Sequence, residues 1–84
     1  MRVCLWNLEE FPIPIDKVEL CGGEGRVLKS VEIGRRIRPN ERFCIDVKVG
    51  EDIHFLEDVK VLLPDFVIIR DVRGVFSDLV LPRH

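Results

Sequence analysis

The chain has 84 residues, a formal net charge of −2 and a hydrophobic fraction of 46%. This length allows one small domain, residues 1–84, and the composition excludes a disordered tail, a strongly basic nucleic-acid arm and a membrane-spanning segment. The sequence contains no Ala, Thr, Gln or Tyr, whereas Val and Ile together number 20. Because Ala favours helices and β-branched residues favour strands, this composition predicts an all-β protein.

The first part of the chain contains three segments that are predicted to be strands. Residues 3–8 are apolar on both parities, and residues 17–21 alternate between polar and apolar side chains. A glycine-rich stretch, residues 22–25, leads to a third strand over residues 27–33, and two short strands joined in this way predict a hairpin. Lys29 falls on the apolar parity, so we expect a β-bulge here or a lysine stem lying along the sheet edge.

The clearest strand covers residues 42–49. One parity of this segment holds only apolar side chains, and the other holds Arg42, Cys44, Asp46 and Lys48. Such an alternation is typical of a strand with one face buried and one face in water. Turn-forming residues precede it at 39–41 and follow it at 50–52. The inward parity consists of Phe43, Ile45, Val47 and Val49.

The segment 51–63 has two interpretations. Val59, Val61 and Leu63 alternate as they would in a strand that ends before Pro64. Apolar side chains from Ile53 to Leu63 also fit a helical spacing, so one short helix within this segment is an alternative.

Two further apolar segments complete the pattern. Residues 66–69 are apolar on both faces, which predicts a central strand, and residues 75–81 form a last strand that ends at Pro82. Together these segments make about seven short strands, with turn signals roughly every 8–12 residues. The expected fold is a small antiparallel β-sandwich. The alternatives are a small β-barrel, or an α+β domain with one short helix near 51–63.

A series of features covers about half of the chain, in the order Asn7, Pro12, Pro14, residues 15–20, a hairpin and residues 37–43. In this order they resemble the middle of immunoglobulin-like accessory domains. In those domains a short strand that ends in Asn and a Pro-Gly-Glu turn before an alternating strand are common. Asn40 stands here where that turn usually has Gly. The resemblance implies a β-sandwich that binds or spaces other proteins and has no catalytic residues to carry over.

The cysteines indicate a reducing compartment. Cys4, Cys21 and Cys44 are odd in number and far apart, whereas disulfide-linked secreted domains usually have an even and denser set. The N-terminal apolar run is also too short for a signal peptide. We therefore expect three free thiols in a cytoplasmic protein. A zinc site formed with His54 is an alternative, but the spacing matches no ligand pair, so we expect no metal and no cofactor.

Charge is unevenly distributed along the chain. Residues 26–48 carry a net charge of +4, and the flanking segments carry −3 each. Guanidinium groups bind phosphate or carboxylate bidentately, so the arginines are candidates for an anion- or RNA-binding site. Such arginines more often pair with acidic side chains of the same chain or of a neighbouring subunit. Aromatic residues for base stacking are absent nearby except Phe43, which makes nucleic acid the weaker partner. The candidate residues are Arg35, Arg36, Arg38 and Arg42.

The sequence contains few candidate catalytic residues. Ser30 and Ser77 lie in no nucleophile motif, and the glycine-rich residues 22–25 lack the Lys-Ser/Thr of a phosphate-binding loop. Acidic pairs adjoin turns, where they keep the chain soluble and protect sheet edges. We therefore expect no enzyme activity.

Several strands are apolar on both faces, whereas a two-layer domain hides only one face of each sheet. Cys4 and Ile68, with other apolar side chains, should then reach the outside, where exposed apolar patches usually mark contact surfaces. Tryptophan is a frequent anchor of such interfaces. We predict a non-catalytic interaction module that forms a homo-oligomer, such as a homodimer, or docks on a protein partner. Abundant charge with few amides also resembles a thermophile composition. The candidate contact residues are Trp6, Leu8, Leu62 and Phe66.

Overall fold

The computed structural model describes residues 1–65, 67–71 and 79–80. The described residues form strands connected by loops and two short 3-10 helices, which confirms the all-β class. In chain order the elements are β1 (Arg2–Trp6), β2 (Ile13–Cys21), η1 (Gly23–Gly25), β3 (Val27–Ile37), β4 (Arg42–Asp46), η2 (Glu51–Phe55), β5 (Asp58–Leu62), β6 (Val67–Asp71) and β7 (Leu79–Val80).

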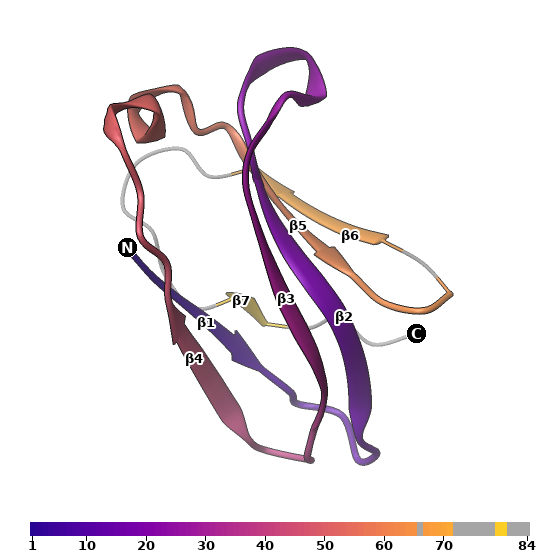
Figure 1. The fold of residues 1–84 in the computed structure, drawn as a ribbon. Coiled ribbons are helices and arrows are strands. Elements are labelled where there is room, and N and C mark those ends of the chain that lie inside the picture. Colours follow the sequence, from indigo (N-terminus) through magenta and orange to yellow (C-terminus); the bar gives the residue numbers. More distant parts are fainter. Residues whose placement is uncertain (66, 72–78, 81–84) are drawn as a thin grey trace.

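The strands are arranged in two sheets, with the orders β4-β1-β7 and β3-β2-β5-β6 (Figure 1). Neighbouring strands are antiparallel, except that β1 and β7 are parallel, so the prediction of an entirely antiparallel arrangement is wrong for this pair. The sheets of the described residues do not close into a barrel. No helix within these residues is long and apolar enough to cross a membrane.

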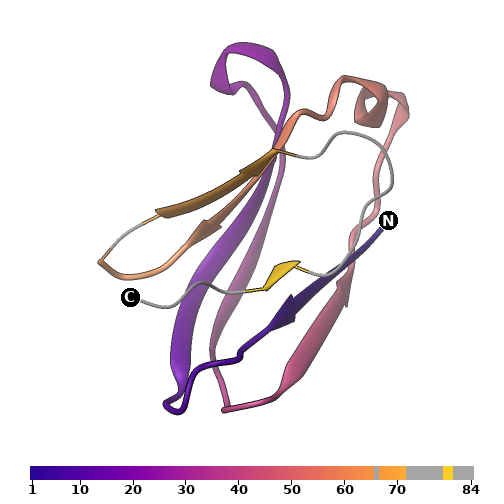
Figure 2. The ribbon, with the colours of Figure 1, turned by 180° about the vertical axis from the view of Figure 1, so that it is seen from behind.

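The chain crosses twice between the sheets at one end of the molecule. Residues 7–12 lead from β1 to β2, and residues 38–41 lead from β3 back to β4 (Figure 1). The two 3-10 helices, η1 and η2, lie at the opposite end in both views (Figure 2). The two ends of the molecule are therefore formed by different loops.

The β2–β3 hairpin confirms the prediction, and both strands are longer than expected. Cys21 is opposite Val27, whereas Leu20 is opposite Lys29, so β3 contains one extra residue, Leu28. This irregularity is the bulge that the position of Lys29 predicted. It leaves the Lys29 side chain on the same face as the buried Leu20, at the edge of the sheet.

A second irregularity lies further along the same hairpin. Ile15 pairs with Arg35 and Lys17 pairs with Glu32, which again leaves one extra residue on β3. Gly34 lies in this bulge with a φ of 58°, a left-handed conformation that glycine adopts at low cost because it has no Cβ. The two bulges limit the regular part of this edge strand, which is a common protection against pairing with another sheet.

The core lies between the two sheets and takes residues from both. The inward parities predicted for residues 17–21 and for residues 59–63 are confirmed, since those side chains are buried. In the segment 42–49 the inward parity is also confirmed, although β4 ends at Asp46 rather than at Val49. The buried cluster consists of Val3, Leu5, Ile13, Ile15, Val18, Leu20, Ile37, Val47, Val59, Val61 and Leu63.

The structure decides between the two interpretations of segment 51–63. Residues 51–55 form the 3-10 helix η2, and residues 58–62 form β5, so a short helical turn precedes a strand. The prediction that residues 66–69 form a central strand is wrong, because β6 is the last strand in the order of its sheet. A segment that is apolar on both faces does not reveal how many strands flank it. Most of the predicted strand 75–81 lies outside the described residues.

Candidate functional site

The outer face of the sheet β4-β1-β7 carries the most distinctive group of side chains. Val3 and Leu5 of β1 point into the core, so Arg2, Cys4 and Trp6 share the opposite face. Across the antiparallel pair with β4, the partners on this face are Arg2 with Asp46, Cys4 with Cys44, and Trp6 with Arg42.

Cys4 and Cys44 form a disulfide bond across this face. The two residues are directly opposite each other, with 4.0 Å between their Cα atoms and 40 residues between them in sequence. The expectation of three free thiols is therefore wrong, because strand pairing brings two distant cysteines together. Cys4 is also 5% exposed, so the expectation that it reaches the outside is wrong as well.

The third cysteine lies elsewhere. Cys21 is a buried free thiol at the end of β2, and burial raises the pKa of this thiol above its usual value. The alternative of a zinc site from the three cysteines and His54 is wrong, because two of its thiols are joined in the disulfide. Among the described residues, no group of three or more His, Cys, Asp or Glu side chains is arranged to hold a metal ion.

Three large apolar side chains are exposed where β1 ends and the first crossing begins. Trp6 is 39% exposed, Leu8 37% and Phe11 46%. We call these three residues the Trp6 surface. Leu62, a third contact candidate, is half-buried on β5 in the other sheet, and Phe66 lies outside the described residues. Trp6, Leu8 and Phe11 are thus exposed within one short segment of the chain, and the sequence interpretation missed Phe11.

A single buried asparagine holds the loop that carries Leu8 and Phe11. The Asn7 side chain is fully buried, and its Nδ2 donates hydrogen bonds to the carbonyl oxygens of Phe11 (3.0 Å) and Ile37 (2.9 Å). Its Oδ1 accepts a hydrogen bond of 2.8 Å from the backbone N–H of Glu9. All the polar atoms of this side chain are thus bonded, which fixes the loop at the base of the Trp6 surface.

The backbone of Asn7 is hydrogen-bonded to the second connection between the sheets, residues 38–41. Its N–H donates to the carbonyl of Glu41 (3.0 Å), and its carbonyl accepts from the N–H of Asn40 (2.8 Å). Asn40 has a φ of 62°, in the left-handed region. The turn before β4 is therefore held against the loop that carries the Trp6 surface.

Two of the four candidate anion-binding arginines pair with an acidic residue of the chain itself. Glu41 accepts a hydrogen bond from the backbone N–H of Arg38 (2.8 Å) and forms ion pairs with Arg35 (2.9 Å) and Arg38 (3.7 Å). The N–H of Arg38 and the neighbouring guanidinium groups lower the pKa of Glu41 below its usual value. Arg35 also lies over the ring of Phe43, 4.3 Å from its centroid, and so bridges β3 and β4 at the edges of the two sheets.

The other two candidate arginines differ in position. Arg42 lies opposite Trp6 on β4, and Arg36 is exposed on β3 opposite Pro14. Arg36 lines a shallow depression at the second bulge, and Asp16 lines it too. The structure thus does not gather the four arginines around one open cationic site. Anion binding stays a prediction that depends mainly on Arg36.

No family model matches the chain, and comparison with curated proteins and with solved structures gives no significant match. Evidence about function therefore comes from the geometry of the described residues.

Proposed function

We propose that this protein is a small, non-catalytic interaction module that acts by self-association through the Trp6 surface. The observation that supports the proposal is the exposure of Trp6, Leu8 and Phe11 on one segment that a fully bonded Asn7 holds in place. A preorganised apolar surface loses little conformational entropy on binding, so most of its burial energy contributes to affinity. Tryptophan at such a position is a common anchor of protein interfaces.

The architecture in this proposal is an immunoglobulin-like β-sandwich. Two sheets that share one buried core support a sandwich. The turn at residues 39–41 supports the resemblance, because Asn40 adopts the left-handed conformation that the glycine of a Pro-Gly-Glu turn would favour. Asn7, which ends the first strand, is bonded to this turn.

A second copy of the chain is the partner that fits this face best. Both signs of charge lie on the same outer face as Trp6, with Arg42 opposite Trp6 and with Arg2 and Asp46 at the other end of β1 and β4. A two-fold axis can place each charge near its opposite and each tryptophan near an arginine of the other copy. Docking on a different protein is the alternative outcome.

Sedimentation at micromolar concentration tests the proposal. We expect the wild-type chain to sediment as a dimer, and Trp6→Ala and Phe11→Ser to shift it to the monomer. Phe55→Ser is the matched control, because Phe55 is 69% exposed at the opposite end of the molecule and its loss should leave the dimer intact. A wild-type monomer, or equal dissociation by the Phe55 variant, would contradict self-association through this surface.

We also propose that the protein works in the cytoplasm of a thermophile. A disulfide is unusual in cytosolic proteins of mesophiles, whereas intracellular proteins of hyperthermophiles contain many. The composition agrees with this source, since the sequence has two Asn, no Gln and abundant charge. Thermal unfolding tests the proposal, and we expect a midpoint above about 90 °C. A midpoint in the range of mesophile proteins would contradict it.

A further inference from the structure

The strand β4 lies at the edge of its sheet. The sheet order is β4-β1-β7, and no strand of residues 1–65, 67–71 and 79–80 other than β1 pairs with β4 (Figure 1). The register of β4 with β1 is regular over the whole strand, whereas β3, the edge strand of the other sheet, is interrupted by two bulges. Because a regular edge strand offers backbone groups to which another strand can bind, β4 is less protected than β3.

The pairing with β1 determines which backbone groups β4 presents at this edge. Met1 and Val47 exchange hydrogen bonds of 2.6 and 2.9 Å, and in an antiparallel ladder such bonded pairs alternate with pairs that exchange none. Cys4 and Cys44 are a pair of the second kind, since the 4.0 Å between their Cα atoms is close to the about 4.5 Å of such pairs. The residues whose N–H and C=O groups therefore point away from β1 are Arg42, Cys44 and Asp46.

A second copy of β4 fits this edge in one antiparallel register. A two-fold axis at Cys44 places this residue opposite itself in the other copy, and it places Arg42 of each copy opposite Asp46 of the other. The residues with outward-pointing backbone groups then meet one another, and each opposed pair can exchange two backbone hydrogen bonds. The backbone of β4 is therefore complementary to itself.

The side chains of β4 match in the same register. Arg42 and Asp46 are exposed on the outer face and carry opposite charges, so the axis brings two pairs of opposite charge together, which stabilises a sheet. On the inner face, Phe43 of each copy lies opposite Ile45 of the other. Both side chains are only partly buried against the core, so the pairing removes from water apolar surface that a single chain leaves at this edge.

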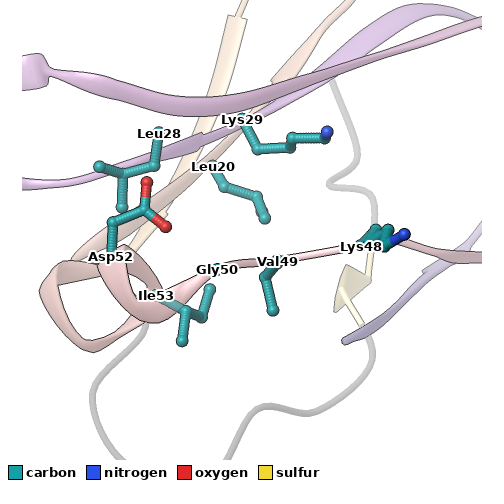
Figure 3. A pocket seen from close by; sticks show the side chains of 8 residues that line it. All are labelled: Leu20, Leu28, Lys29, Lys48, Val49, Gly50, Asp52 and Ile53. Carbon is teal, nitrogen blue, oxygen red and sulfur yellow. The ribbon is translucent and has the colours of Figure 1, made fainter.

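From this register we propose that β4 binds β4 of a second copy, edge to edge, so that the two β4-β1-β7 sheets become one continuous sheet. The contact is limited to Arg42–Asp46, because β4 ends there and residues 48–50 then line a pocket before η2 (Figure 3). A contact of one short strand is smaller than a standard interface, so we expect a dissociation constant of roughly 0.1–1 mM. The contact does not involve the Trp6 surface and does not depend on it.

Hydrogen exchange of the β4 amides at increasing protein concentration tests the proposal. The Phe11→Ser variant is used, because it changes the Trp6 surface and leaves every residue of β4 in place. Between about 0.02 and 2 mM protein, the amides at the new contact should exchange about threefold more slowly. The amides of Phe43 and Ile45 point to β1 and should not depend on concentration, so they are internal controls. The amides expected to slow are those of Arg42, Cys44 and Asp46.

Two charge variants in the same Phe11→Ser chain test the register. Arg42→Glu places acidic side chains opposite each other across the axis, and Asp46→Lys places cations there, so each should weaken association about tenfold. An equimolar mixture of the two variants should restore association, because every opposed pair then has opposite charges. Arg36→Glu is the matched control, since it makes the same change of charge on the edge strand of the other sheet.

Three outcomes would overturn the proposal. The first is exchange at Arg42, Cys44 and Asp46 that does not depend on protein concentration. The second is a mixture of the two charge variants that associates no better than either alone, and the third is an equal loss of association in Arg36→Glu. The amide spectrum of each variant shows whether it is folded. Self-association through the Trp6 surface is tested on the wild type at micromolar concentration, so the failure of either proposal is distinguishable from the failure of the other.

Discussion

The Asn7 side-chain amide donates a hydrogen bond of 2.9 Å to the backbone carbonyl of Ile37, 30 residues further along the chain. The bond links the end of β1 in one sheet to the end of β3 in the other. It lies within the buried interior, where a hydrogen bond is strong and an unpaired polar group is costly. One short side chain thus couples the core to the loop that carries the exposed aromatic residues.

We predict that Asn7→Ala lowers the free energy of unfolding by about 3 kcal/mol, because it leaves the carbonyls of Phe11 and Ile37 without their donor. Asn7→Asp should be comparably destabilising, since a carboxylate cannot donate to either carbonyl. Urea unfolding measures both. Asn40→Gly is the control, because glycine accepts the positive φ of this residue and should leave stability nearly unchanged. A loss below about 1 kcal/mol in Asn7→Ala would contradict the role assigned to this side chain.

The disulfide predicts a specific thiol count. Under non-reducing conditions the denatured chain should react with one equivalent of a thiol reagent, at Cys21, and the reduced chain with three. The folded protein should react slowly at neutral pH, because Cys21 is buried and its raised pKa keeps the thiol protonated. Mass spectrometry of the alkylated chain measures all three states. Fast labelling of the folded protein, or three equivalents without reductant, would contradict the pairing.

Reduction of the disulfide has an energetic consequence. The bond closes a loop of about 40 residues, and the loss of this constraint on the unfolded chain should lower stability by about 4 kcal/mol. Trp6 lies two residues from Cys4 on the same face. Because disulfides quench nearby indole fluorescence, emission should also rise when the bond is broken and the chain is still folded. In Cys21→Ala both effects should remain, whereas Cys4→Ser should be insensitive to reductant.

Local patterns predicted the strands and their faces because side-chain alternation depends only on neighbouring residues. The alternating residues of 59–63 are buried as predicted, and the bulge in β3 was visible because Lys29 interrupts an apolar parity. The order of strands in the sheets was not predictable in the same way. The parallel pairing of β1 with β7 and the edge position of β6 depend on contacts between distant segments, which no local pattern encodes.

The candidate site was predictable in part for the same reason. Trp6 and Leu8 could be chosen as contact candidates from the sequence, because tryptophan is rare and frequent in interfaces and because both faces of this strand are apolar. Phe11 was missed because it lies in an irregular loop, although the following Pro12 marked this stretch as a surface segment. The disulfide was missed because an odd cysteine count concealed a pair. The available signal was that Cys44 lies on the polar parity of its strand, and strand pairing then places it opposite Cys4.

Glu41 predicts a specific acid dependence of stability. Its pKa in the folded protein is lowered, first by the hydrogen bond from the N–H of Arg38 and further by the charge of Arg35. The carboxylate therefore stabilises the fold above its unfolded pKa, near 4.5, and this contribution is lost as the pH falls through the lower folded value. In Glu41→Gln the loss of stability below about pH 5 should be shallower than in the wild type. Urea unfolding at several pH values measures this, and an unchanged slope in Glu41→Gln would contradict the role assigned to this carboxylate.

The ion pairs of the arginines also predict a weak affinity of the protein for nucleic acid. Because Glu41 pairs with Arg35 and Arg38, we expect little binding of a labelled single-stranded RNA even at about 50 mM salt. Glu41→Gln should strengthen binding, since it releases both guanidinium groups, and added salt should reverse the gain. Fluorescence anisotropy measures these changes. Tight, salt-sensitive binding by the wild type that is lost in Arg36→Glu would instead support the anion-binding alternative, with Arg36 as its main contact.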